Sequence, residues 1–469
     1  MSAKPAAAAG VSANPAAVAS VSAKPTGARD PPAAATGVRV AVVGAGWSGL
    51  AAAWRATTLG HAVTLYEMAP MAGGRARRLP AEASPVPGLA LDTGQHILIG
   101  AYRATLDLLA ELGVDEQAAF RRRPLALVDA RGRGLELPAG AAVPAFVRGV
   151  LGARGYRLSE RLALLTAASG WLARGFRCDT RLTVAQLTAA LPESIRTGLI
   201  DPLCVAALNT PAALASATVF LRVLRDALFA GPGAADLLLP RVDLGALLPD
   251  AAERALQARG ATLRIGQRVQ AIDREADNTG WRVDGERFDA GVLAASSHES
   301  ARLARPHHVA WADTVQALRH EPIVTVLLHA PDARLPQPML ALQDGRDAPA
   351  QFVFDLGQLR DAQREPGARG VLAAVVSGAS AWVERGLDAT AAAAQAQLQQ
   401  QLHLKAAPAV LRTLCEKRAT FLCTPQLARA PMAVAPGLWA AGDHIDGPYP
   451  ATIEGAVRSG LAAAAAVRA

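Results

Sequence analysis

Residues 38–67 read VRVAVVGAGWSGLAAAWRATTLGHAVTLYE, and this stretch decides the fold. An apolar strand at residues 38–43 runs into the glycine-rich turn GAGWSG, which is followed by a helical stretch and by a second strand that ends in Glu67. The order of strand, turn, helix, strand and acid predicts a βαβ unit that binds an adenine dinucleotide. A glycine-rich turn alone is common by chance, but one placed between these elements is not.

The residues of the turn have separate tasks in such a unit. Gly44 allows the tight turn, Gly46 lets the backbone approach a pyrophosphate, and Gly49 lets the helix pack close to the strand. The helix N-terminus then presents free N–H groups and the positive end of its dipole to the phosphates. Glu67 lies 23 residues after Gly44, where a carboxylate accepts hydrogen bonds from a ribose. The other turn residues are expected at the cofactor as well: Ala45, Trp47 and Ser48.

Length and composition limit the remaining possibilities. A chain of 469 residues exceeds the usual size of one core, so two or three structural domains are expected. The four cysteines form no CxxC pair and have no metal-ligand spacing with histidine, which predicts reduced thiols in a cytoplasmic protein and no metal site. The net charge of +8 is accompanied by only 4% aromatic residues, which argues against nucleic acid as a partner. No long run of large aliphatic residues predicts a transmembrane helix.

Beyond the βαβ unit, the hydrophobic pattern separates a helical region from several strands. Residues 144–239 are mostly helical by their period, with Leu158, Leu162, Leu165 and Leu172 on one face. A second helix is expected at residues 390–404. The expected strands are residues 89–92, then 263–272, 281–283 and 287–294 as a β-meander, and 323–328 and 371–376 in a second sheet. The Ala/Pro-rich residues 1–36 have too little bulk to bury and are expected to be disordered.

Two further motifs carry a resemblance to a known family. They are AGGRARR at residues 72–78, continued by DTGQHILIGAY at 92–102, and WAAGDHIDGPYPATIEGAVRSG at 439–460. With the first turn, they resemble the flavin oxidoreductases of the amine oxidase and phytoene desaturase superfamily. The resemblance implies FAD, with a C-terminal Gly-Asp at the ribityl and pyrophosphate region and a final helix whose N-terminus faces the flavin pyrimidine ring. The further cofactor-binding residues it implies are Gly74, Arg75, Gly94, Gln95, His96, Val269, Gly442, Asp443, Thr452 and Ile453.

The same resemblance implies an α/β fold with two parts. A Rossmann-like FAD-binding domain of the glutathione reductase type is expected from residues 37–100, 240–310 and 410–469. An α+β substrate domain with a helical part is expected from residues 101–239 and 311–409. Chain order alone does not show that the two ends of the chain share one domain.

Within the superfamily, four stretches resemble the hydroxysqualene dehydroxylase branch. They are DTGQHILIGAY, LNTPAALASATVFLRVL, LLLPRVDLG and YPATIEGAVRSG. This branch implies reduction of the allylic alcohol hydroxysqualene to squalene, a precursor of hopanoids and other triterpenoids. Hydride passes from N5 of reduced FAD to an allylic, cation-like carbon, and water leaves. No second GxGxxG follows a strand, so an external electron donor is expected to reduce the flavin.

This chemistry needs an acid for the leaving oxygen and a dry apolar tunnel for the substrate. His96 is the first candidate for the proton donor, because imidazole titrates near neutrality. The alternative is that His96 only hydrogen-bonds to backbone and fixes the flavin loop. Packing roles are favoured for Tyr102 and Tyr449. Asp443 is expected to stay ionised and bind cofactor, and Arg75 either balances the pyrophosphate charge or is a solvated surface residue.

The stretch of residues 146–177 mixes arginines with leucines and a single acid, Glu160. Such a mixture suits a helix on an anionic membrane surface, which would make the protein cytoplasmic and peripheral on the inner face of the membrane. The alternative, which the composition favours slightly, is a core helix of the substrate domain whose arginines extend to water.

Other functions stay open at this level. An oxidative carotenoid or isoprenoid desaturase of the phytoene desaturase type would use the same flavin face with hydride moving the other way. An amine oxidase needs an aromatic cage, and the stretch Phe421-Leu422-Cys423 offers one ring. A non-catalytic flavin-binding or lipid-binding partner in a squalene-forming assembly is the candidate from a different class.

Overall fold

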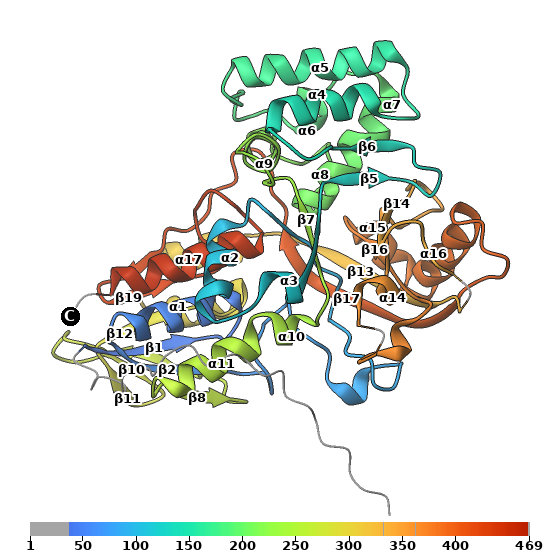
Figure 1. The fold of residues 1–469 in the computed structure, drawn as a ribbon. Helices are drawn as coiled ribbons and strands as arrows, with labels where there is room; N and C mark the ends of the chain where they lie inside the picture. The colour runs from blue at the N-terminus through green and yellow to red at the C-terminus, as the bar shows by residue number, and fades with distance from the viewer. Residues whose placement is uncertain (1–36, 332, 362, 468–469) are drawn as a thin grey trace, which may run out of the picture. The chain divides into compact units, whose positions relative to one another are not determined.

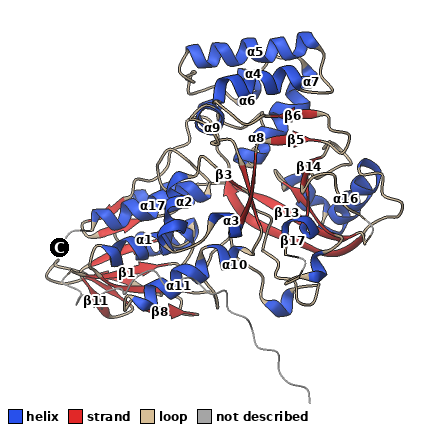
Figure 2. Cartoon of the chain, viewed as in Figure 1, coloured by secondary structure: helices blue, strands red, loops and turns tan. Residues whose placement is uncertain are grey.

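The computed structural model describes residues 37–331, 333–361 and 363–467 (Figure 1). The predicted disordered tail, residues 1–36, lies outside the described residues. Three groups of elements organise the chain, namely a mostly parallel sheet, an antiparallel sheet and a helical layer (Figure 2).

The first sheet combines strands from the beginning, middle and end of the chain. Its order is β18 (Ala433–Ala435), β19 (Leu438–Ala440), β12 (Ala290–Leu293), β1 (Arg39–Val43), β2 (Ala62–Glu67) and β8 (Thr262–Ile265). All neighbours are parallel except β18 and β19. The four residues of β12 are buried, as expected for a strand covered on both faces of a parallel sheet. Both ends of the chain therefore contribute to one sheet.

Helix α1 (Trp47–Thr58) and the final helix α17 (Ile453–Ala466) pack against each other beside this sheet. A Cβ atom on Gly460 would lie 2.0 Å from the Ser48 carbonyl oxygen, so the close approach of the two helices requires glycine there. The other helices around this sheet are α2 (Arg103–Glu111), α3 (Glu116–Ala119), α10 (Leu244–Leu247), α11 (Pro249–Ala258), α12 (Ser297–Ala304) and α13 (Val309–Gln316).

The expected β-meander is present but differs from the prediction at both ends. It consists of β9 (Ile272–Arg274), β10 (Trp281–Val283) and β11 (Glu286–Phe288). The strand expected at residues 263–272 is wrong, because Gly266 with φ +79° ends β8 and the chain leaves the first sheet before β9 begins. The strand expected at 287–294 is divided as well, because its apolar half is β12 in the centre of the first sheet.

The second sheet is antiparallel, in the order β14 (Met339–Ala341), β15 (Phe352–Asp355), β16 (Val371–Val376), β13 (His320–His329) and β17 (Ala409–Phe421). The strands predicted at 323–328 and 371–376 are confirmed, and the helix predicted at 390–404 is α16 (Leu387–Gln401). The domain boundary expected at residue 410 needs correction, because β17 pairs with β13 in this sheet. Shorter helices accompany the sheet: α14 (Leu356–Leu359), the 3₁₀ helix Pro366–Ala368 and α15 (Ser380–Arg385).

The predicted helical region is confirmed as a layer of helices (Figure 1). Its elements are α4 (Ala142–Gly152), α5 (Leu158–Ala173), α6 (Val184–Leu187), α7 (Glu193–Ile195), the π-helical turn Arg196–Ile200, α8 (Asp201–Leu208) and α9 (Ala217–Leu228). A hairpin of β5 (Ala126–Val128) and β6 (Gly134–Glu136) lies beside it, and a small sheet is formed by β3 (Leu98–Ile99), β7 (Leu237–Pro240) and β4 (Phe120–Arg123). Among the described residues, no helix is long and apolar enough to cross a membrane.

The strand expected at residues 89–92 does not form. Leu89 and Leu91 are buried as the alternating pattern suggests, but Asp92 makes only an isolated bridge with Arg78. The 3₁₀ helix Ala81–Ala83 precedes this segment. Alternating burial without a continuous partner strand therefore gives an extended loop.

Candidate functional site

One cavity of about 770 Å³ connects the glycine-rich turn to an apolar chamber deep in the molecule. Its polar part is lined by Gly44, Gly46, Glu67, Arg75 and Asp443, which come from the first sheet and its loops. Its apolar part lies between α8, α9, the β5–β6 hairpin and the second sheet. The cavity therefore brings together the three motifs that are far apart in the sequence.

The glycine-rich turn has the geometry that its sequence predicts. Gly44 has φ +106°, and a Cβ atom there would lie 2.6 Å from the Ala294 carbonyl oxygen. A Cβ atom on Gly49 would lie 1.8 Å from the Gly44 carbonyl oxygen, so a side chain would push the helix off the strand. Gly46 lines the cavity, and its only neighbour at the Cβ position is the Cα atom of Gly74, 3.9 Å away. The backbone of this turn is thus open for close approach by a ligand.

The N-terminus of α1 fits a pyrophosphate. No side chain caps this helix, and its first internal hydrogen bond runs from the Leu50 N–H to the Gly46 carbonyl. The preceding N–H groups are free to bind an anion at the positive end of the helix dipole. Trp47 and Ser48 line the cavity beside them, whereas Ala45 is fully buried and donates its N–H to Glu67 at 2.7 Å.

Glu67 ends β2 and lies in the cavity wall. One carboxylate oxygen accepts the Ala45 N–H at 2.7 Å, and the other accepts the Ala69 N–H at 2.8 Å. These bonds fix the carboxylate, and each oxygen keeps a lone pair for a further donor such as a ribose hydroxyl. The Val269 side chain, expected near adenine, is 3% exposed and also lines the cavity.

Arg75 joins the second motif to the third. Its Nη2 atom lies 2.5 Å from the Asp443 Oδ1 atom, and its Nη1 donates to the Ala419 carbonyl of β17 at 2.7 Å. The Arg75 side chain is 39% exposed but lines the cavity, so its free surface faces the cofactor region. Gly74, which precedes it, packs on Gly46. The arrangement favours the charge-balancing role of Arg75 over that of a solvated surface arginine.

Asp443 stays ionised in this setting. Burial alone would raise its pKa, but the Arg75 guanidinium and the nearby His444 outweigh burial and hold the pKa below the usual range. The preceding Gly442 donates its N–H to the Ser459 hydroxyl at 3.1 Å, which fixes the loop against α17. An ionised, fixed carboxylate suits the binding of cofactor hydroxyl groups rather than proton donation.

The N-terminus of α17 opens on the same cavity. Thr452 caps the helix by accepting the Gly455 N–H at 2.9 Å, and Thr452 and Ile453 line the cavity. Glu454, in the first turn, is 1% exposed and turns away to accept N–H groups of Ala104 and Thr105 at 3.1 and 2.9 Å. Its negative charge therefore serves the start of α2, and the dipole of α17 stays available to an anionic ring.

His96 lies in the cavity wall with Gly94 and Gln95. Its Nδ1 lies 2.9 Å from the Gly94 carbonyl oxygen, and because a carbonyl only accepts, Nδ1 carries a hydrogen. Nε2 is then the nitrogen that gains or loses a proton. Burial lowers the pKa of His96, the bond to Gly94 acts in the opposite direction, and the positive Arg75 lowers it further. The imidazole is therefore mainly neutral near pH 7, and both roles considered for it begin from this anchored ring.

Two other polar side chains, Tyr449 and Asn209, line the cavity. Burial raises the pKa of Tyr449, and the negative charge of Asp226 raises it further, so its hydroxyl stays protonated. Asn209 donates to the Glu321 carbonyl at 3.1 Å and to the Thr420 hydroxyl at 3.0 Å, and it accepts the Gly378 N–H at 2.7 Å. Asn209 therefore joins α8 to the second sheet. Burial raises the pKa of Tyr102, which lines the cavity at the start of α2.

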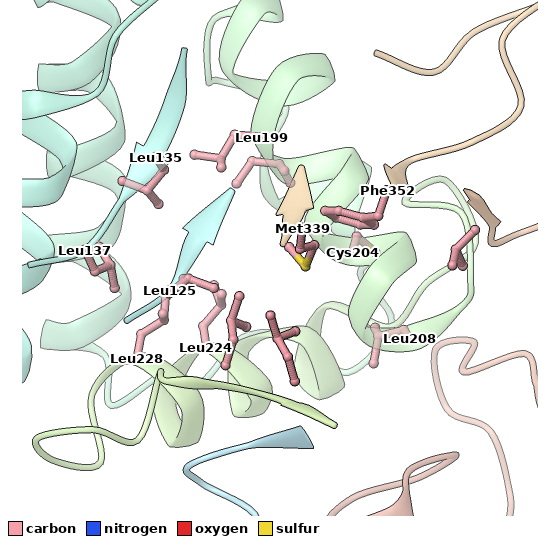
Figure 3. Close-up of a cluster of buried hydrophobic side chains, with 14 of the residues drawn as sticks. Leu125, Leu135, Leu137, Leu199, Cys204, Leu208, Leu224, Leu228, Met339 and Phe352 are labelled. Atoms are coloured by element: carbon pink, nitrogen blue, oxygen red, sulfur yellow. The ribbon is translucent and has the colours of Figure 1, made fainter. Parts of the chain in front are cut away.

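The apolar chamber contains residues that the sequence analysis did not single out. Figure 3 shows part of its wall, where Leu125, Leu208, Leu224, Leu228, Met339 and Phe352 surround one region from three different groups of elements. The other apolar lining residues include Leu203, Val219, Val223 and Phe354. The alternation of Phe352 and Phe354 on β15 was a usable signal, since residues two apart on a strand share a face. Phe421, considered for an amine cage, is 1% exposed in a separate cluster with Leu318 and Cys423.

Comparison with known proteins agrees with this geometry. The model of the family of flavin-containing amine oxidoreductases matches residues 47–468. The chain is 28% identical over 438 residues to a hydroxysqualene dehydroxylase of Rhodopseudomonas palustris, an alignment that covers 91% of this chain and 97% of that protein. It is 27% identical to one of Zymomonas mobilis, with 90% and 97% coverage.

Solved structures show the same fold. An oxidoreductase from Methanosarcina mazei superimposes with a TM-score of 0.67 at 17% identity, covering 90% of this chain and 99% of that one. Cyclohexylamine oxidase from Brevibacterium oxydans superimposes with a TM-score of 0.64 at 18% identity, with 92% and 98% coverage. The family match begins at Trp47, inside the glycine-rich turn, and includes the Arg75–Asp443 contact and the final helix. The chain therefore belongs to the flavin-containing amine oxidoreductase family and is an FAD-dependent oxidoreductase.

Proposed function

We propose that the enzyme reduces hydroxysqualene to squalene. The observation that supports this most is the continuity of the apolar chamber with the cofactor-binding region in one cavity. A thirty-carbon isoprenoid needs a long apolar wall, and the Leu, Val and Phe side chains of α8, α9 and β15 supply one. The relatives named hydroxysqualene dehydroxylase support the same substrate.

In the proposed reaction, the C–O bond of the allylic alcohol breaks and a C–H bond forms at the same carbon. Bound FAD, once reduced by an external donor, supplies the hydride. One proton must join the departing hydroxide to give water. The apolar wall limits the access of bulk water to the developing cation, which favours its capture by hydride.

His96 is the residue that we propose as the source of this proton. Its Nδ1–H stays bound to the Gly94 carbonyl in both protonation states, so the ring can release the Nε2 proton without turning. The lowered pKa makes the imidazolium a stronger acid, although less of it is present at neutral pH. Asp443 does not compete for this role because its carboxylate is held ionised by Arg75.

Product analysis tests the proposal. The holoenzyme is incubated with detergent-dispersed hydroxysqualene and a chemical reductant, and the extracted lipids are analysed by mass spectrometry. Squalene that depends on enzyme, reductant and substrate supports the function. If hydroxysqualene is returned unchanged here, while phytoene is desaturated in a parallel assay with oxidised flavin and no reductant, the enzyme is an oxidative desaturase. If neither changes while FAD stays bound, the non-catalytic alternative replaces our proposal.

A further inference from the structure

The outer face of the helical layer carries an unusual number of exposed apolar side chains. Ten large hydrophobic residues are exposed among the described residues, and five of them lie within residues 143–172. These five are Val143, Leu151, Leu158, Leu162 and Leu172, with exposed fractions between 43% and 62%. We call them the leucine face. A cluster of this kind is typical of a surface that contacts another apolar phase.

Helix α5 shows how the face is built. Leu158, Leu162 and Leu172 recur at helical spacing on its exposed side, whereas Leu164 and Trp171 are buried on the other. The exposed side points outward, because α5 is the outermost helix of its layer in Figure 1. The Arg161 side chain donates to the carbonyls of Leu151 and Tyr156, at 2.7 and 2.9 Å, which ties the end of α4 to the first turns of α5. This end of the pair therefore displays Leu151, Leu158 and Leu162 together.

The charge around the leucine face is strongly positive. Residues 142–182 contain seven arginines and two acids, which gives a net charge of +5. Both acids are engaged: Glu160 accepts the Ser194 hydroxyl at 2.7 Å, and Asp179 pairs with Arg181 at 2.7 Å. The exposed arginines that remain are Arg148, Arg154, Arg157, Arg174 and Arg177. Exposed apolar side chains in a segment with an excess of exposed arginines match a bilayer with anionic headgroups.

The same layer also forms the wall of the apolar chamber. Val219, Val223 and Leu224 of α9 line the chamber, and α9 lies beneath α4 and α5 in Figure 1. We infer that the leucine face rests on an anionic lipid bilayer, so that the layer lies between the membrane and the chamber. This inference rests on the proposed function, because a lipid-soluble substrate must be collected from lipid.

Vesicle flotation of the FAD-loaded, full-length enzyme tests this inference. Vesicles of phosphatidylcholine alone are compared with vesicles that also contain phosphatidylglycerol. We expect the enzyme to float with the anionic vesicles and to detach as salt rises from about 0.05 to about 0.5 M, because salt screens the arginines. Absence of flotation with both vesicle types would overturn the inference. This is also the result expected if the leucine face binds a protein partner instead of lipid.

Two variants separate the leucine face from general stickiness. Leu158→Ser, Leu162→Ser and Leu172→Ser together should weaken vesicle binding by about tenfold or more, since each leucine loses apolar burial in the interface. The matched control changes three exposed residues elsewhere, Leu59→Ser, Val309→Ser and Val410→Ser, and should bind like wild type. Equal binding of the two triple variants would overturn the assignment of this face, and thermal unfolding checks that both are folded.

Activity with dispersed substrate distinguishes failure of this inference from failure of the proposed function. With hydroxysqualene in detergent, the leucine-face variant should form squalene at the wild-type rate, whereas with hydroxysqualene in anionic vesicles it should be slower by about tenfold or more. Flotation without squalene formation would remove the proposed function and leave the membrane face intact. If the leucine-face variant formed squalene at the wild-type rate both from vesicles and from detergent, the result would contradict the membrane inference but not the proposed function.

Discussion

Arg75 and Asp443 are 368 residues apart in the chain, yet their side chains form an ion pair of 2.5 Å in the wall of the cofactor cavity. The pair connects the AGGRARR segment, residues 72–78, with the loop that contains Gly442 and Asp443. It also keeps Asp443 ionised and leaves part of the guanidinium facing the cavity. The contact thus joins candidate cofactor-binding residues from the two ends of the chain.

The first prediction concerns this pair. Asp443→Asn leaves the Arg75 guanidinium without its charged partner, and a charged hydrogen bond contributes about 1.5–3 kcal/mol. We expect FAD affinity to fall by about tenfold or more, measured by quenching of FAD fluorescence during titration of the apoprotein. The surface pair offers a control, because Asp179→Asn removes only the exposed contact with Arg181 and should leave FAD affinity unchanged. FAD binding that is equal in both variants would show that the Arg75–Asp443 pair has no role in holding the cofactor.

The chamber gives a second prediction. Val223→Trp adds a large side chain to the wall formed by α9, so the long substrate loses room while the cofactor region is untouched. We expect normal FAD content and a kcat/KM for squalene formation that is lower by about tenfold or more. Val309→Trp, on an exposed site of α13, serves as the matched control. An unchanged kcat/KM in Val223→Trp would place the substrate elsewhere.

A third prediction follows from His96. If imidazolium donates the proton, the rate depends on the protonated fraction, and the pKa of His96 lies below its usual value of 6.5. Above that pKa, kcat should rise by about tenfold for each unit by which the pH falls. His96→Gln should remove this slope and lower kcat by about 10²–10⁴-fold. A flat pH profile in the wild-type enzyme would instead assign His96 to fixing the flavin loop.

The fourth prediction concerns the buried contact between Asp92, in the extended loop before β3, and Arg360, which directly follows α14. The Asp92 carboxylate lies 3.4 Å from Arg360 and accepts the Leu244 N–H at 2.8 Å. Burial raises the pKa of Asp92 to about 7, although Arg360 acts in the opposite direction. A raised pKa favours the protonated carboxyl in the folded state, so this group stabilises the fold at low pH and the contribution is lost as the pH rises through about 7.

Arg360→Met removes the positive charge that stabilises the ionised Asp92 carboxylate and lowers its pKa. We expect Arg360→Met to cost about 1.4 kcal/mol more near pH 8 than near pH 5, because Asp92 is ionised at pH 8 in the wild type and must stay protonated in the variant. Urea denaturation at both pH values measures it. The double variant Asp92→Asn with Arg360→Met removes the charge altogether and should lose this pH dependence. A cost of Arg360→Met that is the same at both pH values would contradict the account.

Much of the first domain could be predicted because its signals are local. The glycine-rich turn needs three glycines at fixed positions, and the structure shows the steric reason for Gly44 and Gly49. The buried runs of β13 and β16 are similarly plain in the sequence. The end of β8 had a local signal too, because Gly266 adopts φ +79° at that point.

Other features depend on tertiary structure. Helix α5 has apolar residues on both sides, so its period identifies a helix but does not decide whether Leu162 or Leu164 is buried. The structure buries Leu164 and exposes Leu162, so the side of α5 that carries Leu158, Leu162 and Leu172 faces away from the core. The Arg75–Asp443 pair and the chamber wall join segments hundreds of residues apart, and no local pattern encodes such contacts. Resemblance to known flavoproteins placed Arg75 and Asp443 each at the cofactor without predicting that they pair, and the chemistry called for an apolar tunnel whose wall residues only the structure identifies.

The central claim is that reduced flavin in this enzyme gives its hydride to hydroxysqualene. An anaerobic single turnover tests it most directly: the holoenzyme is reduced chemically, freed of excess reductant and mixed with hydroxysqualene while flavin absorbance is recorded. Our account predicts reoxidation of the flavin together with one equivalent of squalene for each flavin. Flavin that stays reduced with hydroxysqualene, in an enzyme whose oxidised flavin is reduced by phytoene or an amine, would contradict it.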